Sequence, residues 1–419
     1  ELKSLLTPKS VHELPILNGL RGLSVIMILI FHCFMLPILW IYSNKPELIH
    51  HYIDQIPDFL LLVFAFDKAV DTFFILSAYL LTTQLIHEFK KNSKISFRNF
   101  YIRRFFRIFP VYLFALLLYL VTVKDFHPRL IHNLLFVDNL YNDSIILGGW
   151  SLSIEVQFYV ILPFLILLLN KLKAYRGLFL GSLVLMSLVV RYFIILNHPG
   201  IIEVRWVEII NNSDNLFDVL DIIYHPTYAR FGLLILGIIW AFLNHSQRGL
   251  GRLNRISKTS ATIIFMVSLS LIMLSLQYPA YHLESWFHKY FGLELNIWWL
   301  TLHRTGFGLG VLGIVIMIEL KLLPRILGEL LSRFLSHKVW RLFAQLSLPW
   351  YLFHIPIIIL SYLLLFRTTN FEAITGIRLI HVLAVMVISM SLTLILSMIL
   401  HRFVERPMIR KGKSLTRGA

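Results

Sequence analysis

The segment LNGLRGLSVIMILIFH, residues 17–32, decides the fold of this chain. The apolar run continues to residue 42, and about 20 mostly apolar residues are enough for a helix that crosses a bilayer. Eleven helical steps of about 100° place Arg21 and His32 on one face, some 16 Å apart along the axis. Ionisable groups within a span usually face a cavity or a partner. The segment therefore predicts a membrane helix that also contributes to a functional site.

The composition indicates an integral membrane protein. The chain has 419 residues, of which 57% are hydrophobic and 15% are charged, and its mean hydropathy is +0.73. Soluble domains carry about 25% charged residues. The single cysteine, Cys33, excludes an internal disulfide framework and a cysteine-built zinc site, and we expect no metal.

The long apolar runs predict helices rather than barrel strands, which alternate over about ten residues. We predict an all-α, polytopic membrane bundle of ten transmembrane helices. The second span contains Asp67, Lys68 and Asp71 and is expected to be broken or to start late. The predicted spans are 16–42, 59–86, 100–123, 149–169, 177–196, 229–243, 259–276, 297–319, 342–366 and 376–401.

The distribution of basic residues predicts that both termini are cytoplasmic. Most of the 39 lysines and arginines fall in the tails and loops on one side of the predicted spans. The formal charge of +16 therefore reflects topology and contact with anionic lipid, and not a nucleic-acid partner. We divide the chain into a cytoplasmic tail (1–15), a transmembrane domain (16–407) and a basic cytoplasmic tail (408–419).

An arginine cluster lies at the predicted cytoplasmic mouth of the third span, in YIRRFFRIFP (101–110). Guanidinium groups suit bidentate binding of phosphate. Arg103, Arg104 and Arg107 are therefore candidate ligands of a phosphorylated substrate. The competing interpretation is ordinary anchoring by positive residues on the inner side.

The fourth span has a polar entry, GGWSLSIEVQFYVILP (148–163), in which Glu155 lies inside the membrane. An unpaired carboxylate there would take up a proton or seek a cation. A structural ion pair is the alternative, but so many hydroxyl and amide groups favour a water-lined substrate cavity. We also assign the histidine of SLPWYLFHIP (347–356) to this predicted cavity, although a lone buried histidine more often has a structural role. The predicted cavity residues are Trp150, Ser151, Ser153, Gln157, Tyr159 and His354.

Two further segments carry charge. In HRFVERP (401–407) we expect Pro407 to end the last helix and Glu405 to pair with Arg402 or Arg406. The longest outside loop, 197–228, is acidic, and we interpret it as a solvated face rather than a lid over a cavity.

Taken together and in order, these segments resemble the acyltransferase 3 family of membrane acyltransferases. The matching segments are LNGLRGLSVIMILIFH, FFILSAYLLT, YIRRFFRIFPVYL, WSLSIEVQFY, SLPWYLFHIP and FVERP, and they extend from Leu17 to Pro407. Ala78 and Val156 depart from the family pattern, which commonly has glycine and a second acidic residue there. We expect a stand-alone form without a fused esterase-like domain.

The resemblance implies transfer of an acyl group, usually acetyl from cytoplasmic acetyl-CoA, to a hydroxyl of a glycan or lipid-linked sugar on the far side of the membrane. The family's arginine–histidine pair falls on Arg21 and His32, its arginine motif on Arg104 and Arg107, and its glutamate on Glu155. O-antigen of lipopolysaccharide, capsule, peptidoglycan, a macrolide and a secreted oligosaccharide all remain possible acceptors. The expected location is the inner (cytoplasmic) membrane of a bacterium.

Acyl transfer to an alcohol needs a base and a means to stabilise an oxyanion. We predict that His32 is the base or a transient acyl carrier, and that Glu155, if close, orients its ring. Arg21, together with the arginines of 101–110, would hold the phosphates of acyl-CoA. A transporter or flippase gated by Arg21 and Glu155 is the main alternative, and a lipid-linked glycan polymerase is another.

Overall fold

The computed structural model describes residues 15–42, 45–120, 126–198, 219–246, 251, 255–276 and 286–416. Every regular element in these ranges is helical, which confirms the all-α fold class. Seven stretches of the described residues are long and apolar enough to cross a membrane, with α7 and α8 counted as one stretch. The chain is therefore a multi-helix membrane protein.

Ten helices of the described residues have 18 residues or more, and each overlaps one predicted span. That all ten cross the bilayer stays a prediction, because α4 and α5 lie outside the seven apolar stretches. The ten helices are α2 (Pro15–Leu36), α4 (Ala69–Asn92), α5 (Phe97–Leu120), α7 (Gly149–Leu172), α8 (Arg176–Leu196), α11 (Thr227–His245), α13 (Lys258–Ser275), α14 (Trp286–Glu319), α17 (Ser347–Leu365) and α18 (Leu379–Leu400).

Shorter elements join the long helices. The second predicted span is indeed interrupted: a 3₁₀-helix, η2 (Asp58–Lys68), precedes α4. The predicted span 342–366 is split at Leu346 between α16 and α17. The other short helices are α3 (Pro46–Asp54), α6 (Phe126–Leu134), α15 (Arg325–Leu335), α16 (Lys338–Gln345) and α19 (Arg406–Ser414), with π-helical turns η1 (Pro37–Ile41), η6 (Leu220–Tyr224) and η9 (His401–Glu405) and short 3₁₀ turns η3 (Asp138–Leu140), η4 (Lys173–Tyr175) and η8 (Phe371–Ala373).

The end of the chain differs from the prediction. Pro407 does not end a helix but lies in the first turn of α19, where its missing N–H group costs no hydrogen bond. The carboxylate of Glu405 pairs with Arg107 of α5 and accepts a hydrogen bond from His401 at 2.6 Å. The tail is thereby attached to the bundle next to the arginine motif.

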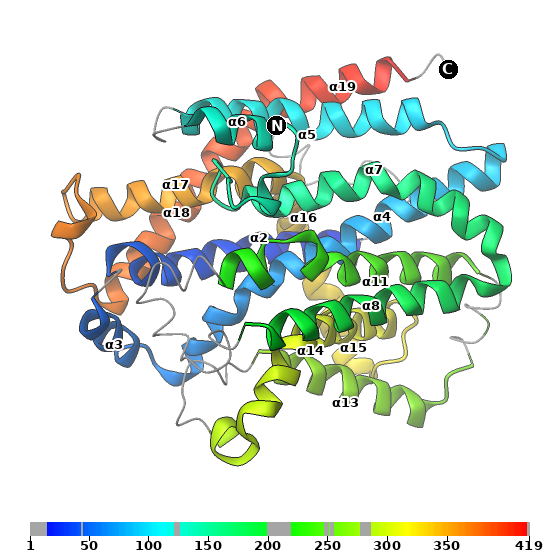
Figure 1. Cartoon of the computed structure of the whole chain (residues 1–419), viewed down its shortest axis with the longest axis horizontal. Coiled ribbons are helices and arrows are strands. Elements are labelled where there is room, and N and C mark those ends of the chain that lie inside the picture. Colours follow the sequence, from blue (N-terminus) through cyan, green and yellow to red (C-terminus); the bar gives the residue numbers. More distant parts are fainter. Residues whose placement is uncertain are drawn as a thin grey trace.

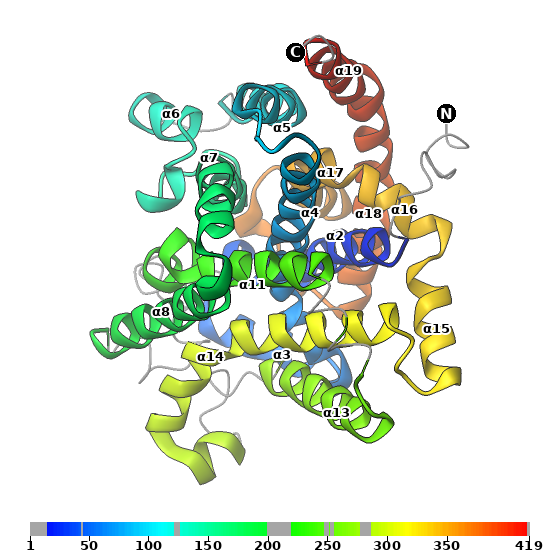
Figure 2. The same ribbon diagram turned by 90° about the vertical axis from the view of Figure 1, so that its right-hand side faces the viewer.

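Helix α2 lies in the middle of the bundle, while α5 and α13 lie at opposite ends of it (Figures 1 and 2). It packs against α4, α15, α16 and α17. The glycines of its NGLRGL segment explain how closely it packs, because a side chain at Gly19 or Gly22 would collide with the backbone carbonyl of Leu335 or of Trp340. Arg21, between them, is therefore held in a fixed position.

The proposed solvated loop is largely beyond the described part of the chain. Of its acidic residues, Glu203, Glu208, Asp214 and Asp218 lie in 199–218, outside the described residues, and so do most residues of the N-terminal tail. Asp221 is described and lies in η6.

Candidate active site

The arginine motif lines a cavity of about 320 Å³ between α2, α4, α5, α7 and α17. We call it the arginine cavity. Its charged lining residues are Arg21, Arg104, Arg107 and Glu155. Arg21 donates a hydrogen bond to Ser347 at 3.2 Å, and the buried Nε atom of Arg104 has no partner within the described residues. The structure thus brings together arginines from two segments that are far apart in the sequence.

Not every predicted arginine lines this cavity. Arg103 points to the C-terminal segment, where its Nε atom donates to Thr416 at 3.1 Å. Arg107 lines the cavity but is already paired with Glu405. Arg21 and Arg104 are therefore the cavity's two arginines without a carboxylate partner in the described part of the chain.

His32 lines a second, larger cavity of about 890 Å³, which we call the histidine cavity. Trp150, another predicted cavity residue, lines it as well. Its other charged and histidine lining residues come from segments that the sequence did not connect: Asp67, Lys68, Arg129, Arg191, His225, His303 and Arg304.

The two cavities share the side chains of Val70 and Tyr351. The hydroxyl of Tyr351 donates to the carbonyl oxygen of Gly148 at 3.0 Å and lies 2.6 Å from the hydroxyl of Ser151. Gly148 is the N-cap residue of α7 and has a φ of 84°, a conformation that favours glycine. Tyr351 is therefore anchored at the point where the arginine and histidine cavities meet.

The hydrogen bonds of His32 fix its tautomer. Its Nδ1 atom lies 2.9 Å from the carbonyl oxygen of Ile28 and 3.1 Å from Nε2 of His354. His354 Nδ1 in turn lies 2.7 Å from the carbonyl oxygen of Tyr351. A carbonyl oxygen can only accept, so Nδ1 carries the hydrogen in both rings. The Nε2 atom of His32 is then an acceptor, and it has no partner within the described residues.

The expected approach of Glu155 to His32 is not what the structure shows. Glu155 accepts hydrogen bonds from Ser77 and, at 2.5 Å, from Tyr159, and it lines the arginine cavity. His32 lines the other cavity, and its ring is contacted by His354, which was predicted as a cavity residue but is fully buried and lines neither cavity. The spacing along one helix could not reveal this, because it depends on how α7 and α17 pack against α2.

The other polar residues of the α7 entry divide into two groups. Ser151 and Tyr159 line the arginine cavity. Ser153 and Gln157 instead hold neighbouring segments: Ser153 donates to Asp138, and Gln157 donates to the carbonyl oxygen of Phe136 at 2.7 Å. Burial raises the pKa of Asp138, which lies in the connection before α7. These two residues therefore position α7 rather than line a cavity.

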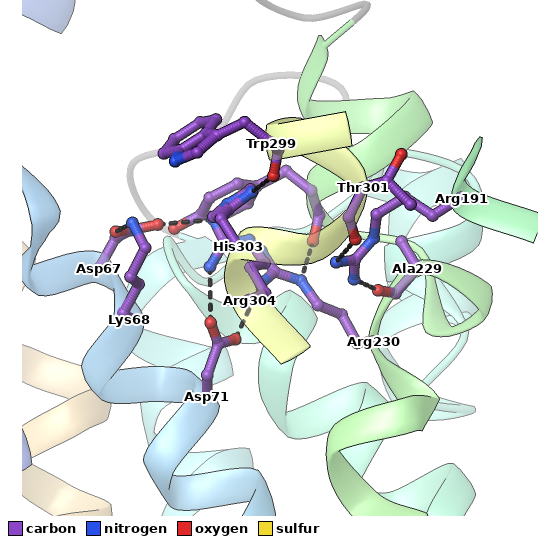
Figure 3. Close-up of polar contacts among 11 residues, drawn as sticks. Asp67, Lys68, Asp71, Arg191, Ala229, Arg230, Trp299, Thr301, His303 and Arg304 are labelled. Atoms are coloured by element: carbon purple, nitrogen blue, oxygen red, sulfur yellow. Dashed lines mark hydrogen bonds and ion pairs between the residues drawn. The ribbon is translucent and has the colours of Figure 1, made fainter. Parts of the chain in front are cut away.

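A buried charge cluster forms one wall of the histidine cavity (Figure 3). Asp71 of α4 accepts from Arg230 and from Arg304, each at 2.8 Å. Arg304 also binds Asp67 at 2.6 Å. Arg191 donates to the carbonyl oxygens of Thr301, at 3.2 Å, and of Ala229.

The sequence contained a signal for this cluster. Asp67 and Asp71 are four residues apart, and several arginines fall within or at the edges of predicted spans. Charges in membrane segments need partners. What the sequence left undetermined was which arginine meets which aspartate. No group of three or more potential metal ligands is found among the described residues.

Comparison with known proteins identifies the family of this chain. Residues 14–402 match the sequence model of the acyltransferase 3 family, described as an acyltransferase domain. The chain belongs to this family. The family resemblance inferred from the six segments is confirmed.

The curated relatives are O-acetyltransferases. The O-acetyltransferase OatA of Staphylococcus aureus (strain NCTC 8325 / PS 47) is 26% identical over 430 residues, which cover 96% of this chain and 58% of the relative. The peptidoglycan O-acetyltransferase OatA of Listeria monocytogenes is 28% identical over 185 residues, covering 38% of this chain and 25% of the relative. The chain thus spans little more than half the length of the first relative. No solved structure matches it.

Proposed function

We propose that this acyltransferase transfers an acetyl group from acetyl-CoA to a hydroxyl of a cell-wall glycan of the peptidoglycan type. The relatives support the acetyl group and, through the Listeria protein, the glycan. We further propose that all ten long helices cross the cytoplasmic membrane of a bacterium with both termini inside. The observation that carries the proposal is the meeting of the arginine cavity and the histidine cavity at Tyr351.

The arginine cavity suits the donor. Arg21 and Arg104 are guanidinium groups without a carboxylate partner in the described part of the chain, and phosphate groups are the anions that such donors bind best. Arg21, Arg104 and Arg107 would hold the phosphates of CoA, while Arg103, which is directed to Thr416, would not. Glu155 limits the positive charge of this cavity and holds Tyr159 in place.

In the proposed reaction His32 acts as the base in the histidine cavity. Its Nε2 atom takes the proton from the acceptor hydroxyl, and the hydroxyl oxygen attacks the carbonyl carbon of the thioester. The bond between that carbon and the CoA sulfur breaks, and the proton passes from His32 to the sulfur. The products are an acetyl ester and free CoA thiol. The Nδ1 proton of His32 stays on the ring throughout, hydrogen-bonded to the carbonyl oxygen of Ile28 and to Nε2 of His354.

The decisive experiment measures acetyl transfer by purified protein in detergent, with labelled acetyl-CoA and soluble peptidoglycan fragments. We expect His32→Ala to abolish labelling of the glycan, because general-base catalysis contributes roughly 10²- to 10⁴-fold. His50→Ala, which removes an exposed histidine outside both cavities, is the control and should keep full activity. Undiminished transfer by a correctly folded His32→Ala protein would refute the proposal. The family match favours this enzyme over the transporter, flippase or polymerase considered above.

A further inference from the structure

The histidine cavity contains a buried arginine that forms no ion pair with a carboxylate among the described residues. Arg191 is 3% exposed and lines the cavity, and its Nη1 and Nη2 atoms donate to backbone carbonyl oxygens. Its Nε atom is buried and has no partner among the described residues. Figure 3 shows its guanidinium between Thr301 and Ala229, apart from both aspartates. A buried ion without an opposite charge is costly, so its retention calls for an explanation.

The neighbouring carboxylates cannot supply that charge, because other arginines already engage them. Both oxygens of Asp71 are occupied, one by Arg230 and the other by Arg304. Asp67 binds Arg304 through its Oδ2 atom. In addition, the Nη2 atom of Arg230 is buried without a partner in the described part of the chain. The cluster therefore retains unused guanidinium donors after its own ion pairs are formed.

Of the cluster's two arginines with an unused donor, Arg191 lines the same cavity as the proposed base. His32 and Arg191 both line it, and its volume of about 890 Å³ lies within the range of sites that enclose small organic ligands. Arg129 adds an exposed cation to the lining, while Asn142 and Ser144 add uncharged polar groups suited to sugar hydroxyls. A molecule bound there can place one group on Arg191 and another near His32.

Building on the proposed function, we propose that the histidine cavity selects an anionic acceptor: a glycan that carries a carboxylate or phosphate group, bound by Arg191, beside the hydroxyl that is acylated. Guanidinium binds both oxyanions in the same way, so the structure specifies this shared chemistry. The two sources, a sugar carboxylate and a sugar phosphate, are separated by experiment.

The test compares matched acceptors with and without the negative charge. The first pair is the disaccharide N-acetylglucosamine–N-acetylmuramic acid with a free carboxylate and the same disaccharide as its methylamide. The second pair is N-acetylglucosamine 1-phosphate and the methyl glycoside of N-acetylglucosamine. We expect the wild type to favour the charged member of at least one pair by about 10- to 100-fold in kcat/KM. Equal use of both members in both pairs would overturn the inference.

Variants assign the preference to the arginine. Arg191→Gln should remove the preference by weakening the charged acceptor alone, whereas Arg191→Lys should keep part of it. Arg367→Gln, an exposed arginine that lines neither cavity, is the control and should keep the wild-type preference. If Arg191→Gln does not fold, Arg129→Gln serves instead, with an expected two- to fivefold loss of preference. A preference unchanged in whichever of these two variants is folded contradicts the proposal.

Binding distinguishes this inference from the proposed reaction. Calorimetry with the His32→Ala protein measures affinity for the charged and neutral disaccharides without turnover. If the charged one binds more tightly and Arg191→Gln in that background removes the difference, the anion site stands even where no acetyl transfer is detected. If transfer occurs but binding shows no dependence on charge, the proposed function stands and the anion site is refuted.

Discussion

The Nε2 atom of His354 lies 3.1 Å from the Nδ1 atom of His32. His354 is fully buried, and its own Nδ1 is bound to the carbonyl oxygen of Tyr351, so its Nε2 lone pair faces the Nδ1 hydrogen of His32. This contact keeps the Nε2 atom of His32 free to accept a proton. His354 is therefore a positioning residue, in the place where we had expected Glu155.

This relationship predicts how two substitutions differ. His354→Phe keeps most of the side-chain volume but removes the acceptor for His32, and we expect kcat to fall about 100-fold, the scale of a misplacement of about 1 Å. His354→Gln can accept through its amide oxygen and should recover part of the rate. The KM for acetyl-CoA should stay unchanged in both. Equal loss in the two variants, or a loss confined to KM, would contradict the positioning role.

Arg104 and Arg103 are adjacent in sequence but point to different surroundings, which makes them a matched pair. Arg104 lines the arginine cavity, while Arg103 binds Thr416. We expect Arg104→Gln to raise the KM for acetyl-CoA by about tenfold or more, as for loss of a charge-assisted hydrogen bond. Arg103→Gln should leave that KM within about twofold. Steady-state kinetics with varied acetyl-CoA concentration measure KM for both variants. Equal effects on KM would indicate that both arginines only anchor the helix at the membrane surface.

Local periodicity allowed part of the site to be predicted. The helical spacing of Arg21 and His32 and the position of the arginine motif depend on single helices, and both residues of the pair line cavities that adjoin Tyr351. The partners of Glu155 depend on how α4 and α7 pack together. That packing brings Ser77 to the carboxylate, and no pattern within one helix encodes it.

In the charge cluster, too, part of the arrangement could be predicted from single helices and part depends on how the helices pack. The sequence showed that Asp71 and Arg304 were charges in or near spans and so needed partners. Their ion pair joins residues more than 200 positions apart, which follows from the packing of α4 on α14. The need for a partner is a local property, whereas its identity is a property of the fold.

Tyr351 lines both cavities, so we predict that the size of its side chain controls passage of the acyl group from the arginine cavity to the histidine cavity. A larger ring in Tyr351→Trp should obstruct the junction of the cavities, so that acetyl transfer falls at least tenfold while acetyl-CoA still protects the protein in thermal unfolding. Tyr351→Phe leaves the ring but loses the hydroxyl contacts to Gly148 and Ser151, at a cost of about 1–2 kcal/mol of stability. It should transfer faster than Tyr351→Trp. Faster transfer by Tyr351→Trp would show that the acyl group does not pass this residue.

Among these substitutions, we expect that of Asp71 to lower the free energy of unfolding most. Its carboxylate is fully buried and binds two arginines, so Asp71→Asn leaves Arg230 without a carboxylate partner in the described part of the chain and leaves Arg304 with Asp67 alone. The substitution should lower the free energy of unfolding by about 3–5 kcal/mol. Glu329→Gln breaks two exposed ion pairs, with Arg325 and Arg333, and should change it by less than about 1 kcal/mol. Denaturant unfolding in one detergent compares them.

Adding Arg230→Gln to Asp71→Asn removes the arginine that has lost its carboxylate partner and should restore part of the lost stability, because the two residues contact each other. Strictly additive losses in the double variant would mean that the 2.8 Å pair contributes no coupling energy. In that case the cluster would be a set of independently solvated ions, and the buried arginine beside it would need no anionic ligand.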